Sequence, residues 1–125
     1  MSGIAQTVLI CDDSESITRL VEAVLADEGY ELKVAASVEQ ALAELDGSPP
    51  DLVVTDLYMP GGGAVAVIEH MRGDPDLAAI PVLLVSGSVE ALSAHGAQSV
   101  GADAHLPKPF RADELRQSVR DLLSR

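Results

Sequence analysis

The fold is decided by the stretch VLICDD at residues 8–13, in which four apolar residues lead directly into two carboxylates. A short, continuous apolar run is typical of a strand that is buried on both faces of a parallel sheet. Four more short runs follow, separated by longer segments in which apolar residues recur with helical spacing. This alternation predicts an α/β fold with helices wrapped around a parallel sheet. The expected strands are 8–11, 32–36, 52–54, 82–85 and 102–106.

The segments between the strands predict five helices. In the first, five apolar residues share one helical face before Gly29: Ile17, Leu20, Val21, Val24 and Leu25. Ser37 and Gln40 form the capping-box signature of a second helix, which ends at Gly47. The fourth helix has the weakest propensity, because it mixes serine and glycine with its alanines. The third, fourth and fifth helices are expected at 65–71, 89–100 and 113–123.

The patterning of the strands predicts their order. Runs 8–11, 52–54 and 82–85 are continuously apolar, whereas the second and fifth runs alternate apolar and polar residues. Central strands are buried on both faces and edge strands are not, so the second and fifth strands belong at the edges. The order is therefore 2-1-3-4-5, the flavodoxin-like doubly wound arrangement. Right-handed crossovers then place the first and last helices on one face and the other three opposite.

Composition narrows the class of protein. The 125 residues carry 8 Lys and Arg against 20 Asp and Glu, a formal net charge of −12. One domain spanning 1–125 is expected from this length, and an acidic chain without basic stripes should not bind nucleic acid. No apolar run is long enough to span a membrane. The first residues lack the features of a signal peptide, and Cys11 has no second cysteine to pair with, so the cytoplasm is the expected location.

Polar residues collect where the strands end. The predicted sheet order brings Asp12 and Asp13, Asp56, Ser86 and Lys108 to one edge, beside the point where strand order reverses. Three neighbouring carboxylates repel one another, and a divalent cation with oxygen ligands such as Mg²⁺ satisfies them. A carboxylate beside such a cation can act as a nucleophile while a hydroxyl and an ammonium bind the transferred group. The pattern predicts phosphoryl transfer to an aspartate.

Each of these residues also has an ordinary structural interpretation. Asp12, Asp13 and Ser86 stand where helix N-caps are placed, and Lys108 alone would be a surface lysine. Independent caps would not also place an acidic pair, a lone Asp56, a hydroxyl and a lysine around one switch point. The conjunction therefore favours a functional site.

Four stretches of the chain carry a family resemblance: 8–13, 51–60, 80–87 and 101–110. Over essentially its whole length the chain resembles a response-regulator receiver domain of two-component signalling. The resemblance implies that Asp56 accepts a phosphoryl group from a histidine kinase or a phosphotransfer histidine. It implies Mg²⁺ ligation by Asp12, Asp13, Asp56 and the backbone carbonyl of Tyr58.

The resemblance also implies roles outside the metal site. Ser86 and Lys108 would bind phosphoryl oxygens, and the Lys108–Pro109 bond would be cis. Output would pass through the fourth helix, fifth strand and fifth helix to an unknown downstream protein.

Three positions depart from the family pattern. The switch residue, usually Tyr or Phe, is His105 here, which is smaller and can titrate. Residues 61–64 read Gly-Gly-Gly-Ala, a loop of high backbone entropy beside the site. Tyr58 is bulky, and we expect its side chain to project over the mouth of the site. Ser88 is too short to steer a water from the opposite side.

The sequence thus predicts a single-domain phosphoacceptor that signals rather than catalyses, assisting only its own phosphorylation and dephosphorylation. Two alternatives stay open: a receiver-like interaction module that works without phosphorylation, and an aspartyl-phosphate phosphatase. A flavin carrier fits less well, because Asp12 and Asp13 would repel its phosphate. His70 and His95 are interpreted as packed or solvated, and Cys11 as a small apolar core residue.

Overall fold

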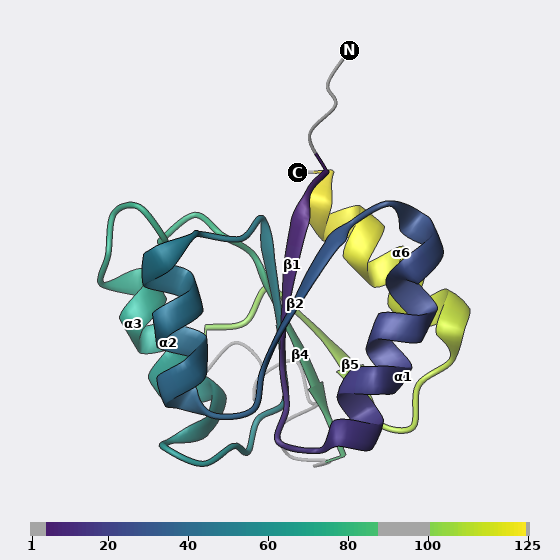
Figure 1. The fold of residues 1–125 in the computed structure, drawn as a ribbon, viewed down its shortest axis with the longest axis horizontal. Coiled ribbons are helices and arrows are strands. Elements are labelled where there is room, and N and C mark those ends of the chain that lie inside the picture. Colours follow the sequence, from purple (N-terminus) through teal and green to yellow (C-terminus); the bar gives the residue numbers. More distant parts are fainter. Residues whose placement is uncertain (1–4, 88–100, 125) are drawn as a thin grey trace.

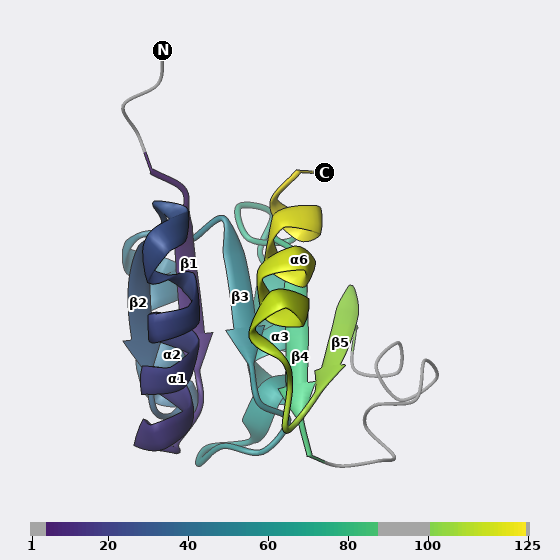
Figure 2. The same ribbon diagram turned by 90° about the vertical axis from the view of Figure 1, so that its right-hand side faces the viewer.

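A five-stranded parallel sheet forms the centre of the computed structural model, which describes residues 5–87 and 101–124. The sheet order is β2-β1-β3-β4-β5, as predicted, with β2 and β5 at the edges (Figure 2). Strand bounds agree with the sequence patterns to within two residues. The strands are β1 (Thr7–Cys11), β2 (Glu31–Ala35), β3 (Leu52–Thr55), β4 (Val82–Ser86) and β5 (Ala104–Pro107).

The helices form one layer on each side of the sheet. Helices α1 and α6 cover one face and α2 and α3 the other, as the crossover rule predicts (Figure 1). Helix α3 begins two residues, and α6 one residue, before the start that the sequence predicts. The helix expected at 89–100 lies outside the described residues. The described helices are α1 (Glu15–Leu25), the short 3₁₀ turn η1 (Ala26–Glu28), α2 (Val38–Gly47), α3 (Gly63–Arg72) and α6 (Ala112–Leu123).

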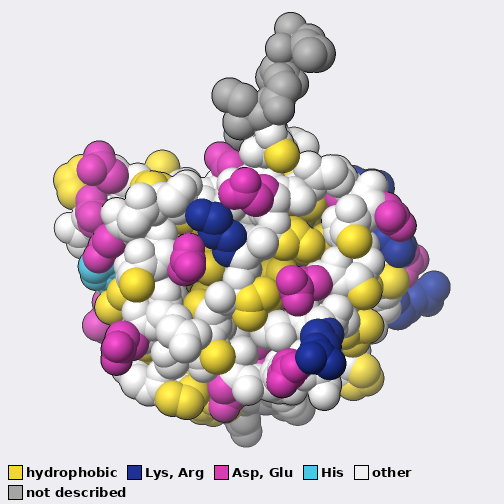
Figure 3. Space-filling model, in the orientation of Figure 1, with side chains coloured by type: hydrophobic (Ala, Val, Ile, Leu, Met, Phe, Trp, Pro, Cys, Tyr) yellow, Lys and Arg dark blue, Asp and Glu magenta, His cyan; other side chains and the backbone are white. Residues whose placement is uncertain are grey.

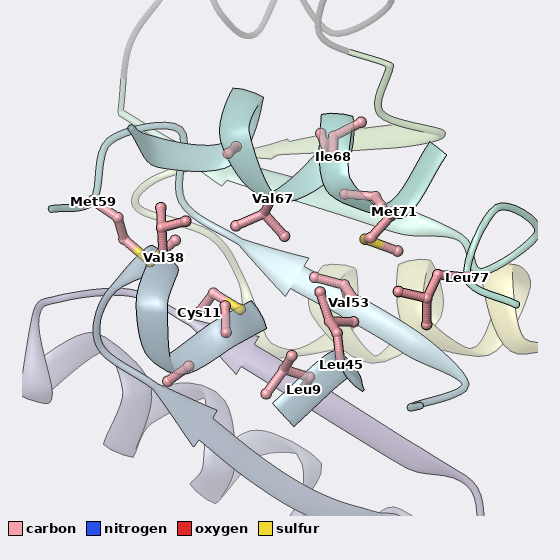
Figure 4. Packing of buried hydrophobic residues seen from close by; sticks show 14 of the residues in the cluster. Leu9, Cys11, Val38, Leu45, Val53, Met59, Val67, Ile68, Met71 and Leu77 are labelled. Atoms are coloured by element: carbon pink, nitrogen blue, oxygen red, sulfur yellow. The ribbon is translucent and has the colours of Figure 1, made fainter. Parts of the chain in front are cut away.

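The side chains of the central strands alternate between two apolar clusters. On β1, Leu9 and Cys11 pack with residues of α2 and α3 (Figure 4), whereas Val8 and Ile10 pack with residues of α1 and α6. All four are almost completely buried. Burial on both faces is the reason why these strands are continuously apolar in sequence.

Cys11 lies inside the cluster that faces α2 and α3. Burial, with a further contribution from the negative charge of Asp12, raises the pKa of its thiol to about 12. A thiol with that pKa is almost entirely protonated at neutral pH and is a poor nucleophile. Its predicted role as a small apolar core residue is confirmed.

Leu20 is not part of the buried face of α1, and this prediction was wrong. Its exposed fraction is 47%, while Val21 next to it is buried. Consecutive residues on a helix are separated by about 100° around its axis, so Leu20 lies at the margin of the apolar stripe. The packing partners of α1 do not extend that far.

Arg72 joins segments of chain that the sequence did not connect. From the end of α3, its guanidinium donates hydrogen bonds to the carbonyl oxygens of Ala78 (2.8 Å), Ile80 (2.9 Å) and Gly101 (3.1 Å). A fourth bond, of 3.1 Å, goes to Oδ2 of Asp103. The Arg72 side chain therefore links the α3–β4 connection to the segment that leads into β5 through hydrogen bonds.

We expect Arg72→Met to lower the free energy of unfolding by about 1 to 2 kcal/mol, because several charge-assisted hydrogen bonds are lost together. The matched control is Arg19→Met on α1, where the arginine is exposed and pairs with Glu15 of the same helix. Urea unfolding measures both variants. Equal stabilities of the two would show that the Arg72 bonds contribute nothing beyond a surface ion pair.

Candidate functional site

The carboxyl ends of four strands bring the predicted site residues to one edge of the sheet. Asp12 and Asp13 follow β1, Asp56 follows β3, Ser86 ends β4 and Lys108 follows β5. Carboxylate oxygens of Asp12, Asp13 and Asp56 all lie within 4.8 Å of one another. Among the described residues these aspartates form the one group of acidic, histidine or cysteine side chains with the spacing of a metal site.

Lys108 supplies the positive charge at this edge. Its Nζ donates a hydrogen bond of 2.7 Å to Oδ2 of Asp12 and lies 3.6 Å from Oδ2 of Asp56. The Lys108–Pro109 peptide bond is cis, and the amide of Lys108 donates to the carbonyl oxygen of Ser86 (3.1 Å). Since one ammonium faces three carboxylates, the site keeps an excess of negative charge.

Backbone amides orient two of the carboxylates. Oδ1 of Asp12 accepts a hydrogen bond from the amide of Ser14 (2.9 Å), and Oδ1 of Asp56 accepts one from the amide of Leu57 (2.8 Å). The amide of Asp56 in turn donates to the carbonyl oxygen of Cys11 (2.9 Å), which ties the end of β3 to β1. These contacts were not expected from the sequence. Every residue except proline has a backbone amide, so the sequence does not show which amides will bond to a carboxylate.

The surroundings of Asp56 raise the pKa of its carboxyl group above the ordinary value. Burial is the largest cause, and the nearby charge of Asp12 acts in the same direction, while Lys108 and the Leu57 amide act against them. Asp12 is also buried, whereas Asp13 is exposed. A cation placed beside Asp56 would therefore stabilise the ionised form of its carboxyl group.

A cavity of about 730 Å³ opens next to Asp56. Tyr58 is one of its walls and has an exposed fraction of 66%, an unusual exposure for a large aromatic residue. Tyr58 thus lies beside the acidic group, and the projection of its side chain over the mouth of the site stays a prediction. The lining residues are Asp13, Asp56, Leu57, Tyr58, Met59, Pro60, Gly62, Gly63 and Val65.

The glycine loop beside this cavity is a bonded turn. The amide of Gly63 donates to the carbonyl oxygen of Met59 (3.1 Å), and the amide of Ala64 donates to that of Leu57 (2.9 Å). Gly63 has a φ of +66°, and a Cβ there would lie 2.2 Å from the Leu57 carbonyl oxygen. The sequence indicated only high backbone entropy; in the structure the glycine permits a close backbone contact.

Two of the three histidines, His70 and His105, lie in the described part of the structure. His105 lies on β5 opposite Leu84 and is partly buried, while its neighbours Ala104 and Leu106 pack in the cluster on the other face. Its role as a switch stays a prediction. His70 is hydrogen bonded to Asp46 of α2 (2.8 Å). His95, like Ser88, lies outside the described residues.

Comparison with known proteins gives the family. Residues 8–120 match the family described as response regulator receiver domain. The chain belongs to this family. The receiver domain of NtrX from Brucella abortus has a TM-score of 0.83 and 31% identity, with 94% of this chain and 98% of that one covered. The chemotaxis response regulator CheY4 of Vibrio cholerae has a TM-score of 0.87 and 28% identity, covering 95% and 99%.

Curated relatives of this receiver domain are longer. The DNA-binding response regulator MtrA of Mycobacterium tuberculosis is 30% identical over 125 residues, which is 100% of this chain and 54% of that protein. The chain thus spans about half the length of the curated relatives it matches.

No helix in the described part of the receiver domain has the length and apolar character needed to cross a bilayer.

Asp56→Asn should stabilise the receiver domain in the presence of EDTA. Because the folded-state pKa of Asp56 is raised, ionisation of this group opposes folding, so the wild type loses stability as pH rises through that pKa. At pH 7 we expect an unfolding midpoint a few degrees above that of the wild type. The difference should shrink towards zero as the pH falls below about 4, because the carboxyl then becomes protonated in the unfolded state as well.

Thermal unfolding followed by circular dichroism at pH 7 and pH 3.5 measures this. Asp76→Asn is the control, because Asp76 is exposed, away from the acidic group. An Asp56→Asn midpoint at or below that of the wild type at pH 7 would contradict the prediction.

Proposed function

We propose that this receiver domain is a phosphoacceptor whose acceptor is Asp56. The supporting observation is the position of Asp56, beside two other carboxylates and 3.6 Å from the ammonium of Lys108. A carboxylate oxygen of Asp56 forms a bond to phosphorus, and the bond from phosphorus to the donor nitrogen breaks. The donor is a phosphohistidine of a histidine kinase or a phosphotransfer protein, and its imidazole is the leaving group. Lys108 balances charge on the phosphoryl oxygens.

Mg²⁺ is the metal that suits this site best. Asp12, Asp13 and Asp56 offer oxygen ligands only, and their excess negative charge favours a hard divalent cation over softer metals. The backbone carbonyl of Tyr58 is proposed as a further ligand. When bound, Mg²⁺ would neutralise charge that develops on the transferred group.

The roles of Ser86 and Lys108 follow from where they lie. Ser86 ends β4, the strand that pairs with β3, and is buried at 1% exposure, while Lys108 follows β5. Lys108 pairs with Asp12 in this structure and would also reach phosphoryl oxygens, since it already lies between Asp12 and Asp56. We propose that both residues bind the phosphoryl group.

The signalling face is proposed around the edge strand β5. It would comprise β5, α6 and the segment at 89–100, which lies outside the described residues, with Ser86 and His105 as the residues that respond. Its partner would be a downstream protein. Acidic side chains are spread over the visible surface in Figure 3, and the net charge of −12 favours a protein partner over DNA for this domain.

Incubation with Mg²⁺ and acetyl phosphate should add one phosphoryl group to the wild type. We expect no adduct on Asp56→Asn and none in EDTA, because the nucleophile or the metal is then missing. Intact mass spectrometry measures this, with Asp76→Asn as a control that should behave as the wild type. An adduct that survives Asp56→Asn would remove Asp56 as the acceptor.

The same samples separate the alternative functions. Failure of the wild type to form any adduct would favour a module that works without phosphorylation. Many turnovers on p-nitrophenyl phosphate would favour a phosphatase, which would need a water-activating base in addition to Asp56.

Tyr58→Ala should shorten the lifetime of the phosphorylated form. Hydrolysis requires a water in line with the scissile bond, and a side chain beside the acceptor hinders its approach. We expect loss of the adduct to become about tenfold faster, which corresponds to roughly 1.4 kcal/mol in the barrier. Loss of the adduct is followed by mass against time.

Tyr58→Phe is the matched control, because it keeps the ring and removes the hydroxyl. A rate close to that of the wild type supports shielding by the ring. Slower hydrolysis in Tyr58→Phe and Tyr58→Ala alike would instead show that the hydroxyl assists the attacking water.

A further inference from the structure

The connection between β2 and α2, residues 35–38, makes backbone hydrogen bonds to both acidic segments of the site. The carbonyl oxygen of Ala35 accepts a bond of 3.1 Å from the amide of Asp12. The amide of Val38 donates a bond of 3.0 Å to the carbonyl oxygen of Pro60, in the loop that follows Asp56. One short stretch of chain thus spans the gap between the end of β1 and the loop after β3.

The side chain of Val38 packs against the same loop. It is buried at 5% exposure and belongs to the cluster that contains Met59. Figure 4 shows Val38 and Met59 together at one end of that cluster, with Leu77 at the other. A Cβ on Gly61 would lie 3.0 Å from the Cβ of Val38, so the loop backbone rests directly on this valine.

The first turn of α2 is itself held in place, so it can act as a support. Oγ of Ser37 accepts a bond from the amide of Gln40 (3.2 Å), and Oε1 of Gln40 accepts one from the amide of Ala36 (2.8 Å). These two bonds tie the first turn of α2 to the residues that precede Val38. The loop after Asp56 therefore docks on a rigid element.

We propose that Val38 is a positioning residue for the metal and phosphoryl site. Its amide and side chain hold residues 57–63, the segment that carries Tyr58, whose carbonyl would join Asp12, Asp13 and Asp56 in holding the metal. The inference rests on the proposed Mg²⁺ site. Because Mg²⁺ demands near-ideal octahedral geometry, a small displacement of one carbonyl weakens binding more than it weakens the fold.

Val38→Ala and Val82→Ala form a matched pair. Both remove the same atoms from a buried valine of the same cluster, but Val82 begins β4, at the end of the strand away from the site. We expect both variants to lower the urea midpoint. Calorimetry should show the Mg²⁺ dissociation constant rising about fivefold in Val38→Ala and less than about twofold in Val82→Ala.

Val38→Pro tests the backbone bond separately. Val38 is the first residue of α2, a position where proline is well tolerated, and Ser37 before it is already extended, with φ −151° and ψ 165°. Proline therefore removes the amide donor while α2 is retained, which circular dichroism checks. We expect the dissociation constant to rise about tenfold.

Amide exchange in EDTA gives a readout that needs no metal. The amides of Gly63 and Ala64 close the loop through Met59 and Leu57, so they should exchange faster in Val38→Pro than in the wild type.

Three outcomes decide the matter. A wild type that binds Mg²⁺, with Val38 variants that bind it equally well, would overturn the positioning role alone. A wild type that binds no Mg²⁺ would overturn the proposed function and this inference with it. Selective weakening in the Val38 variants, with faster exchange at Gly63 and Ala64, would support both.

Discussion

Repulsion among three carboxylates is the constraint on which this molecule depends. Asp12, Asp13 and Asp56 are held within 4.8 Å of one another, and Lys108 is the ammonium that faces them. Such an arrangement opposes folding, so it persists only because the rest of the domain supplies stability from elsewhere. Burial is the main cause of the raised pKa of Asp56, and the negative charge of Asp12 adds to it. The same repulsion makes the site ready to accept a cation and a phosphoryl group.

The compensating stability comes from the sheet that carries the acidic residues. β1 and β3 are buried on both faces, and each is followed by an aspartate whose backbone amide is bonded to a neighbouring strand. The apolar strands therefore fix the positions of the charged residues that follow them. At the opposite end of the sheet, Arg72 is hydrogen bonded to Asp103.

Sequence patterns predicted the architecture well because burial leaves a direct mark on composition. Continuous apolar runs separated central strands from edge strands, and this alone selected the strand order. The expected site residues could be identified because parallel strands end on the same edge. The pattern failed for Leu20, where periodicity shows which side of a helix is apolar but not how far the packing surface extends. The sequence pattern gave no sign of the Arg72 bonds, because three of their acceptors are backbone carbonyl oxygens. Asp103, the fourth acceptor, is likewise bonded to a backbone amide, that of Val82.

The sequence by itself determined the fold class, the order of the strands and the identity of the residues at the acidic edge, because hydrophobic periodicity and residue chemistry are local properties. Only the tertiary structure decided how these residues are held. The contact of Val38 with the loop after Asp56, the pairing of Lys108 with Asp12 and the need for glycine at position 63 all depend on distances between segments far apart in the chain. Such distances are set by packing, and a single sequence carries no separate signal for them.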